Sequence, residues 1–172
     1  VQATRAPDGR KLLTTRLATP FSFRQPWSEF PQVIEVHDWI DGMRHQRREV
    51  AALPLASEVP IGGVRTGARS VQWVPGRLAS LVWVEALDGG DPRRAAEQRD
   101  RWLRLDLERD LGAAPTKLVE VVHRATGILF FDDPDRFVVS EFDRDRRWIR
   151  ATLVDALARL VPVVLELSLI HI

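Results

Sequence analysis

Short runs of strand-forming residues, separated by turn residues, recur along almost the whole chain. Pro75-Gly76, Gly89-Gly90 and Asp132-Asp133-Pro134-Asp135 each interrupt the pattern with residues that favour tight turns. The runs are Lys11–Leu17, Val33–Trp39, Glu49–Leu53, Ser70–Val74, Leu81–Ala86, Arg99–Leu107, Thr116–His123, Ile128–Phe131, Phe137–Phe142, Arg147–Val154 and Val161–Leu165. Runs this short and this evenly spaced predict an all-β fold.

The runs group into units of four strands. Residues 70–123 and 127–166 each hold four, and residues 1–54 hold three plus a fourth that would precede the turn at Pro7-Asp8-Gly9. A spacing of about 40–55 residues per unit is the size class of β-propeller blades. We therefore predict a partial propeller of four-stranded antiparallel blades, about two complete and one partial. A β-sandwich is the alternative.

Two segments have some helical character. Asp91–Arg104 is highly charged with a Pro near its start, and Asp155–Leu160 could form one turn. Neither carries an extended apolar stripe, so we expect strand rather than helix over Arg99–Leu107.

Composition excludes several classes of function. The 172 residues carry a net charge of +1, which gives no overall attraction to nucleic acid or to an anionic membrane. There is no Cys, so thiolate metal sites and Cys nucleophiles are excluded. No apolar run approaches the ~20 residues of a membrane helix. The sequence does not indicate a cellular compartment.

Chemical motifs are also missing. The chain has no G-x-S-x-G nucleophile elbow, no phosphate-binding loop and no dinucleotide-binding motif. The four His have no metal-ligand spacing among themselves. We therefore assign no catalytic residue, no metal site and no cofactor to this chain.

Strand order predicts where the long loops lie. In a blade whose strands run alternately up and down, the loops between strands two and three share a face with the connections between blades. The segments on that face would be 18–32, 56–69, 87–98 and 143–146. Long loops gathered on one face are where scaffolds usually carry function.

Three charged residues at that rim are candidates for substrate contact: Glu85, Asp88 and Arg144. A carboxylate at Glu85 could receive a cationic group, with an intramolecular salt bridge as the alternative. Asp88-Gly89-Gly90-Asp91 could hold a cation, but a tight turn is the favoured interpretation. The alternating charges of 143–147 favour an ion-paired hairpin over a nucleic-acid contact.

The same pattern predicts burial. We expect Trp73, Trp83 and Val84 to lie largely inside, and the charged side chains of Asp143–Arg146 to be mostly exposed.

Several strings of the chain together resemble the propeller of a prolyl-oligopeptidase-like group of serine peptidases, which includes bacterial peptidases and the plant chloroplast glutamyl endopeptidases. They occur in family order over about residues 6–155. The strings include Ser70-Val71-Gln72-Trp73, Leu81–Pro92, Thr66-Gly67-Ala68-Arg69 and Ser140–Trp148. Phe142 stands where members of the group usually carry Tyr, so no peptide specificity is transferred.

The resemblance implies an N-terminal propeller that caps a C-terminal α/β-hydrolase domain with a Ser-Asp-His triad, located beyond Glu166. This chain would then be the non-catalytic part of a serine peptidase acting on oligopeptides, inactive alone, which gates or positions peptides. Its partners would be the hydrolase domain and the peptide. A stand-alone propeller that binds a protein partner is the alternative, and an RNA-binding surface built on the Arg content comes last.

The end of the chain has an unusual string. Residues 167–172 resemble one reading frame of a transposon-end adapter used in preparing DNA sequencing libraries, as in metagenomic work. On that interpretation the native coding sequence is interrupted near Glu166 and His171 belongs to no site. The alternative is a native apolar tail.

Overall fold

Twelve strands form three four-stranded antiparallel sheets in the computed structural model, which describes residues 1–40, 42–57, 59–155 and 163–168. The first sheet contains β1 (Gln2–Arg5), β2 (Lys11–Leu17), β3 (Gln32–Ile40) and β4 (Met43–Leu53). The second contains β5 (Arg69–Trp73), β6 (Ser80–Ala86), β7 (Asp100–Asp106) and β8 (Thr116–Val121). The third contains β9 (Arg124–Phe130), β10 (Arg136–Asp143), β11 (Trp148–Asp155) and β12 (Val163–Ser168).

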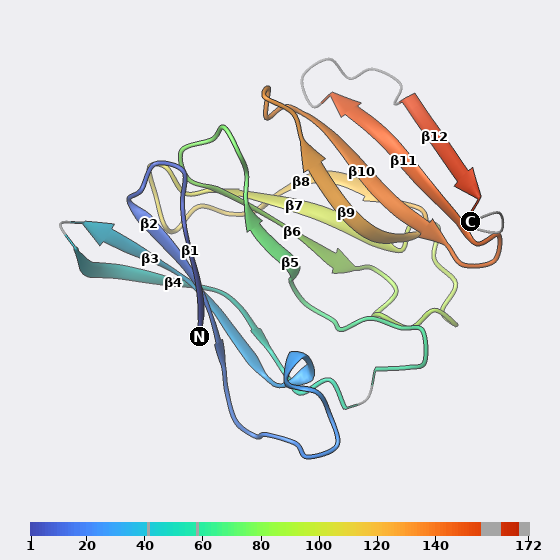
Figure 1. Ribbon diagram of the computed structural model, residues 1–172, viewed down its shortest axis with the longest axis horizontal. Coiled ribbons are helices and arrows are strands. Elements are labelled where there is room, and N and C mark those ends of the chain that lie inside the picture. Colours follow the sequence, from blue (N-terminus) through green and yellow to red (C-terminus); the bar gives the residue numbers. More distant parts are fainter. Residues whose placement is uncertain (41, 58, 156–162, 169–172) are drawn as a thin grey trace.

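Each sheet is a meander in which every strand pairs with the strand before it in the chain (Figure 1). The first sheet has four strands where the sequence suggested a partial unit, because β1 supplies the strand expected before Pro7-Asp8-Gly9. The predicted all-β class is confirmed. No sheet closes on itself within the described residues, and the arrangement is compatible with consecutive blades of a propeller.

The middle sheet is covered on both faces, and β6 shows how. Leu81 and Trp83 belong to the core shared with the first sheet, whereas Val82 and Val84 belong to the core shared with the third. Successive side chains of a strand point to opposite faces, so a strand covered on both sides is buried along most of its length. A stack of sheets with the middle one covered on both faces is what adjacent propeller blades require.

Helical structure is almost absent from the described residues. Within the predicted run Arg99–Leu107, residues Asp100–Asp106 form strand β7 rather than helix, as expected. The one helical element there is a 3-10 turn at Trp27–Glu29, which the sequence did not predict. The suggested turn at Asp155–Leu160 lies, beyond its first residue, outside the described residues. No helix in the part of the chain that the structure describes is long and apolar enough to cross a membrane.

The connections divide between two ends of the stack (Figure 1). The β2–β3, β4–β5, β6–β7 and β10–β11 connections lie at one end, and the turns β1–β2, β3–β4, β5–β6 and β9–β10 lie at the other. Contacts across the sheets agree: Arg65 bonds the carbonyl of Ser28 at the first end. Arg77 pairs with Asp135 at 2.5 Å at the second end. The long loops therefore share one face, as strand order predicts, and we call it the loop face.

Two burial predictions need correction. Trp83 and Val84 are buried, but Trp73 is only half-buried, because it lies at the end of the short strand β5 and its indole N–H bonds the carbonyl of Thr4. Asp143 is buried rather than exposed, since it continues the buried face of β10. Arg144, Asp145 and Arg146 are exposed, as expected.

Candidate functional site

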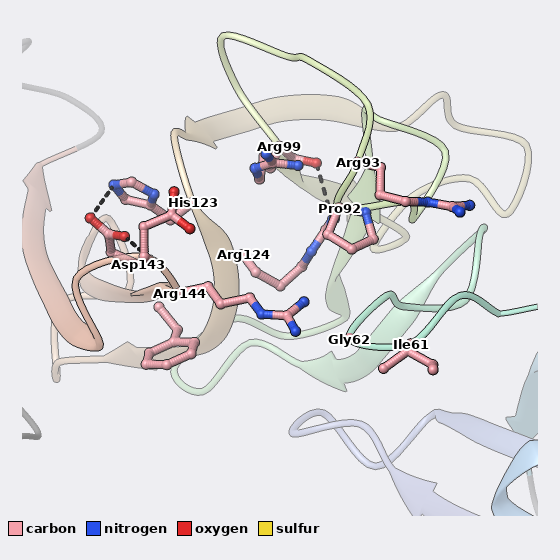
Figure 2. A pocket seen from close by; sticks show the side chains of 11 residues that line it. Ile61, Gly62, Pro92, Arg93, Arg99, His123, Arg124, Asp143 and Arg144 are labelled. Carbon is pink, nitrogen blue, oxygen red and sulfur yellow. Dashed lines mark hydrogen bonds and ion pairs between the residues drawn. The ribbon is translucent and has the colours of Figure 1, made fainter.

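A pocket of about 720 Å³ opens on the loop face, where three long loops meet (Figure 2). Loop 56–69 contributes Ile61 and Gly62, loop 87–98 contributes Pro92 and Arg93, and the β10–β11 loop contributes Arg144 and Asp145. The remaining lining residues come from the ends of strands and from the β8–β9 connection. These are Arg99, His123, Arg124, Phe142 and Asp143.

Close backbone contact joins two of the loops that line this pocket. The amide of Val64 donates to the carbonyl of Gly90 at 3.0 Å. Gly90 has φ +77°, and a Cβ there would lie 2.0 Å from the carbonyl oxygen of Val64. A Cβ on Gly63 would lie 2.5 Å from the carbonyl oxygen of Gly90. Glycine is required on both sides because the two backbones leave no room for a side chain.

Arg65 ties the same loop to the first sheet. Its guanidinium donates to the carbonyls of Ser28, Phe30 and Pro54 at 2.5–3.2 Å. Burial lowers the pKa of Arg65, against an opposing effect of nearby Glu29. Loop 56–69 is therefore connected to both loop 18–32 and loop 87–98.

A buried network of charges lies beneath the pocket. Asp88 accepts hydrogen bonds from Arg99 at 2.9 Å and Arg124 at 2.5 Å. Asp100 accepts from Arg124 at 2.5 Å and from Arg69 at 2.8 Å. Both carboxylates are fully shielded from solvent. Since Arg124 begins β9, Asp100 begins β7 and Asp88 lies in the β6–β7 connection, the network joins the second and third sheets directly under the loop face.

The protonation of Asp88 follows from this setting. Burial acts to raise its pKa, but hydrogen bonds from Arg124, Arg99 and the Gly90 amide outweigh it, so the pKa lies below its usual range. Asp88 is therefore ionised at neutral pH and holds two guanidiniums in place. It also confirms the tight-turn interpretation of Asp88–Asp91, because its Oδ1 accepts the Gly90 amide at 2.9 Å.

A histidine and an aspartate face each other on one wall of the pocket (Figure 2). His123 Nε2 lies 3.6 Å from Asp143 Oδ2, and the His123 amide donates to Glu141 at 2.6 Å. Burial acts to raise the pKa of Asp143. The pKa is nevertheless lowered by the amides of Arg146 and Asp145 and by His123 and Arg146. Asp143 thus holds the β10–β11 turn and lies beside the His123 ring.

Arg144 differs from the other cations of the pocket. It is exposed, and among the described residues it makes no hydrogen bond or ion pair. Its side chain points across the opening toward Gly62 and Ile61 (Figure 2). A Cβ on Gly62 would lie 2.1 Å from Arg144 Nη1, so the guanidinium rests against the glycine backbone.

The three candidate residues of the sequence therefore fall into different settings. Glu85 accepts a hydrogen bond from the Trp83 indole at 2.8 Å and lies 3.7 Å from Arg101, which matches the intramolecular alternative. Asp88 lies under the pocket, and its carboxylate accepts hydrogen bonds from two Arg side chains. Arg144 lines the opening directly.

Sequence reasoning missed Arg124, Asp100 and the His123–Asp143 pair. Arg124 follows a predicted strand, at a connection between two sheets on the loop face. That position in the sequence could have identified it as a candidate site residue. No group of three or more potential metal ligands occurs in the described portion of the chain.

Comparison with known proteins finds similarity to two plant proteins that are named as endopeptidases. No protein-family model matches the chain. It is 32% identical over 145 residues to a protein of Oryza sativa subsp. japonica named probable glutamyl endopeptidase, chloroplastic. It is 34% identical over 142 residues to a protein of the same name from Arabidopsis thaliana.

The matches cover most of this chain but little of the relatives. They span 83% and 81% of this chain, but only 15% and 14% of the two plant proteins. The chain is thus similar to a short section of proteins named as endopeptidases.

Proposed function

We propose that the chain is the non-catalytic propeller part of a serine peptidase that hydrolyses oligopeptides, and that its loop face gates or positions the peptide. The main structural support is the pocket where the β4–β5, β6–β7 and β10–β11 connections meet. Further support comes from the similarity to proteins named as endopeptidases, of which the chain spans 14–15%. A Ser-Asp-His hydrolase domain encoded outside this sequence would supply the chemistry.

The chemistry of the pocket fits binding rather than bond cleavage. His123 and Asp143 form a pair of the kind that activates a nucleophile. The lining residues in the described part of the chain, however, include no Ser, Thr, Cys, Lys or Tyr that such a pair could activate. Several Arg and the apolar Ile61 and Phe142 surround the opening instead, a mixture suited to holding a peptide.

A protein-interaction scaffold is the second candidate, and one observation favours it. Phe21, Phe23 and Trp27 in the β2–β3 loop are largely exposed. Exposed aromatics that gather on one loop are typical of a surface that meets another protein. On the first proposal the same surface would contact the hydrolase domain.

The test begins with the coding sequence downstream of codon 166. The peptidase proposal expects a G-x-S-x-G motif followed by Asp and His. It also expects the encoded intact protein to cleave fluorogenic peptides and to be labelled by a fluorophosphonate that reacts with active serines. The 172-residue chain is the matched control and should show neither.

Two results would contradict the proposal. A stop codon soon after one more four-stranded unit would leave the scaffold as the better function. Turnover by the purified 172-residue chain, abolished by the fluorophosphonate, would show that the chain is itself catalytic.

A further inference from the structure

Most of the arginine side chains around the pocket already form hydrogen bonds or ion pairs with carboxylates of the same chain. Arg99 and Arg124 hold the buried Asp88, and Arg124 also holds Asp100. Arg93 makes two hydrogen bonds to Asp91, at 2.9 and 2.8 Å. Among the pocket-lining arginines of the described chain, Arg144 alone keeps its full set of guanidinium donors free.

The position of Arg144 suits it to meet a ligand. The β10–β11 turn that carries it is held by Asp143, which accepts the amides of Asp145 and Arg146 at 3.0 and 3.1 Å. Gly62 presents backbone without a side chain beneath the guanidinium. The donors therefore face the opening from a turn that is fixed at its base.

From this geometry we infer that Arg144 binds a carboxylate of the peptide, an inference that rests on the proposed function. A guanidinium offers paired N–H groups that match the two oxygens of one carboxylate. Asp143 and Asp145 nearby disfavour a polyanion such as nucleic acid, whereas a single carboxylate needs only one free cation. Ile61 and Phe142 offer apolar surface for the neighbouring part of the peptide.

A peptide has two sources of this group: an acidic side chain and the C-terminal carboxylate. Four peptides of otherwise equal sequence separate them, all acetylated at the N-terminus. One has an internal Glu and an amidated C-terminus, and its control has Gln in place of Glu. The third peptide has no acidic residue and a free C-terminus. The fourth peptide has Gln in place of Glu and a longer C-terminal end, which is amidated.

The measurement is a titration of the full 172-residue chain followed by NMR, including the Arg Nε–H signals. We expect the Arg144 Nε–H signal to shift with a carboxylate-bearing peptide and to stay in place with the Gln-containing amides. The variant R144Q should weaken binding of the carboxylate peptide by at least about tenfold, the usual effect of losing a charged hydrogen bond. R144K, which keeps the charge without the paired donors, should retain part of the affinity.

The matched control is R109Q, which removes an exposed Arg from the β7–β8 loop at the opposite end of the sheets. It should change the dissociation constant less than twofold. Equal binding of carboxylate and amide peptides, unaltered in R144Q, would overturn the inference while leaving peptide binding by the loop face intact. If none of the four peptides binds, both the inference and the proposed function are contradicted.

Discussion

Removing the carboxylate of Asp100 should destabilise the protein more than almost any other single change to a charged side chain. Asp100 is fully buried and accepts three hydrogen bonds. They come from Arg69 at 2.8 Å, from Arg124 at 2.5 Å and from the amide of Ala125 at 2.7 Å. Asp100→Ala would leave Arg69 without its ion-pair partner and Arg124 with only Asp88. Both guanidiniums are about 15% exposed, so water cannot fully replace the lost partner.

Breaking a buried ion pair by removing one partner costs about 3–5 kcal/mol. In a domain of this size each kcal/mol lowers the melting temperature by roughly 2–4 °C, so a fall on the order of 10 °C is expected. The loss should also couple to Arg124. The effects of Asp100→Ala and Arg124→Met should fail to add by about 0.5–3 kcal/mol, because the two residues share one network.

The assay is urea denaturation followed by the fluorescence of the six Trp, with circular dichroism as a second probe. Asp132→Asn is the control, because Asp132 is exposed and its side chain makes no hydrogen bond or ion pair within the described residues. It should stay within about 0.5 kcal/mol of the parent. A loss below about 1 kcal/mol for Asp100→Ala would contradict this prediction, since it would mean that solvent already reaches the network.

Two further predictions follow from the same end of the sheets. The pKa of Asp88 is lowered in the folded state, so unfolding takes up a proton at acid pH. The contribution of Asp88 to the free energy of unfolding is therefore full above its unfolded pKa of about 3.9 and is lost as the pH falls below it. The contribution of Asp88 to the free energy of unfolding should therefore stay constant from pH 7 to 5 and decrease below about pH 4. In Asp88→Asn, denaturation measured across the same pH range should show a smaller decrease of the unfolding free energy below pH 4. Gly90→Ala should lose more than about 1 kcal/mol, because its Cβ would meet the Val64 backbone at φ +77°. Gly127→Ala, with open space and no positive φ, should be neutral or stabilising; equal losses in the two variants would contradict the close approach of the loops.

The strands were predictable where apolar residues alternate, and less so where a strand is exposed. β6 and β10 agree with their predicted runs to within one residue. The run predicted at Glu49–Leu53 is only the end of β4, which starts at Met43. Its first half is rich in Arg, and most of its described side chains there face solvent, so its sequence has little apolar signal. β1 is exposed throughout and was predictable only from the turn that follows it.

The site was predictable as a face but not as a set of contacts. Strand order alone grouped the loops, because antiparallel meanders fix which connections share an end. The hydrogen-bonded partners in the buried network lie 11–36 residues apart in sequence, and Arg124 comes from a different sheet than Asp88 and Asp100, so tertiary packing determines the pairing. Asp143 carried a usable signal: it continues the alternation of Phe137 and Val139, which the charge of the following residues obscured.

Peptide binding by the loop face can be tested by locating a bound peptide on the surface of the chain. A peptide bearing a photoreactive diazirine would be irradiated with the full chain, and the cross-linked residues identified by mass spectrometry. We expect cross-links in 56–69, 87–98 and 143–146, and an excess of unlabelled peptide should reduce them. Cross-links confined to the opposite turns, at 75–79 and 132–135, would contradict the assignment of the loop face as the side that meets peptides.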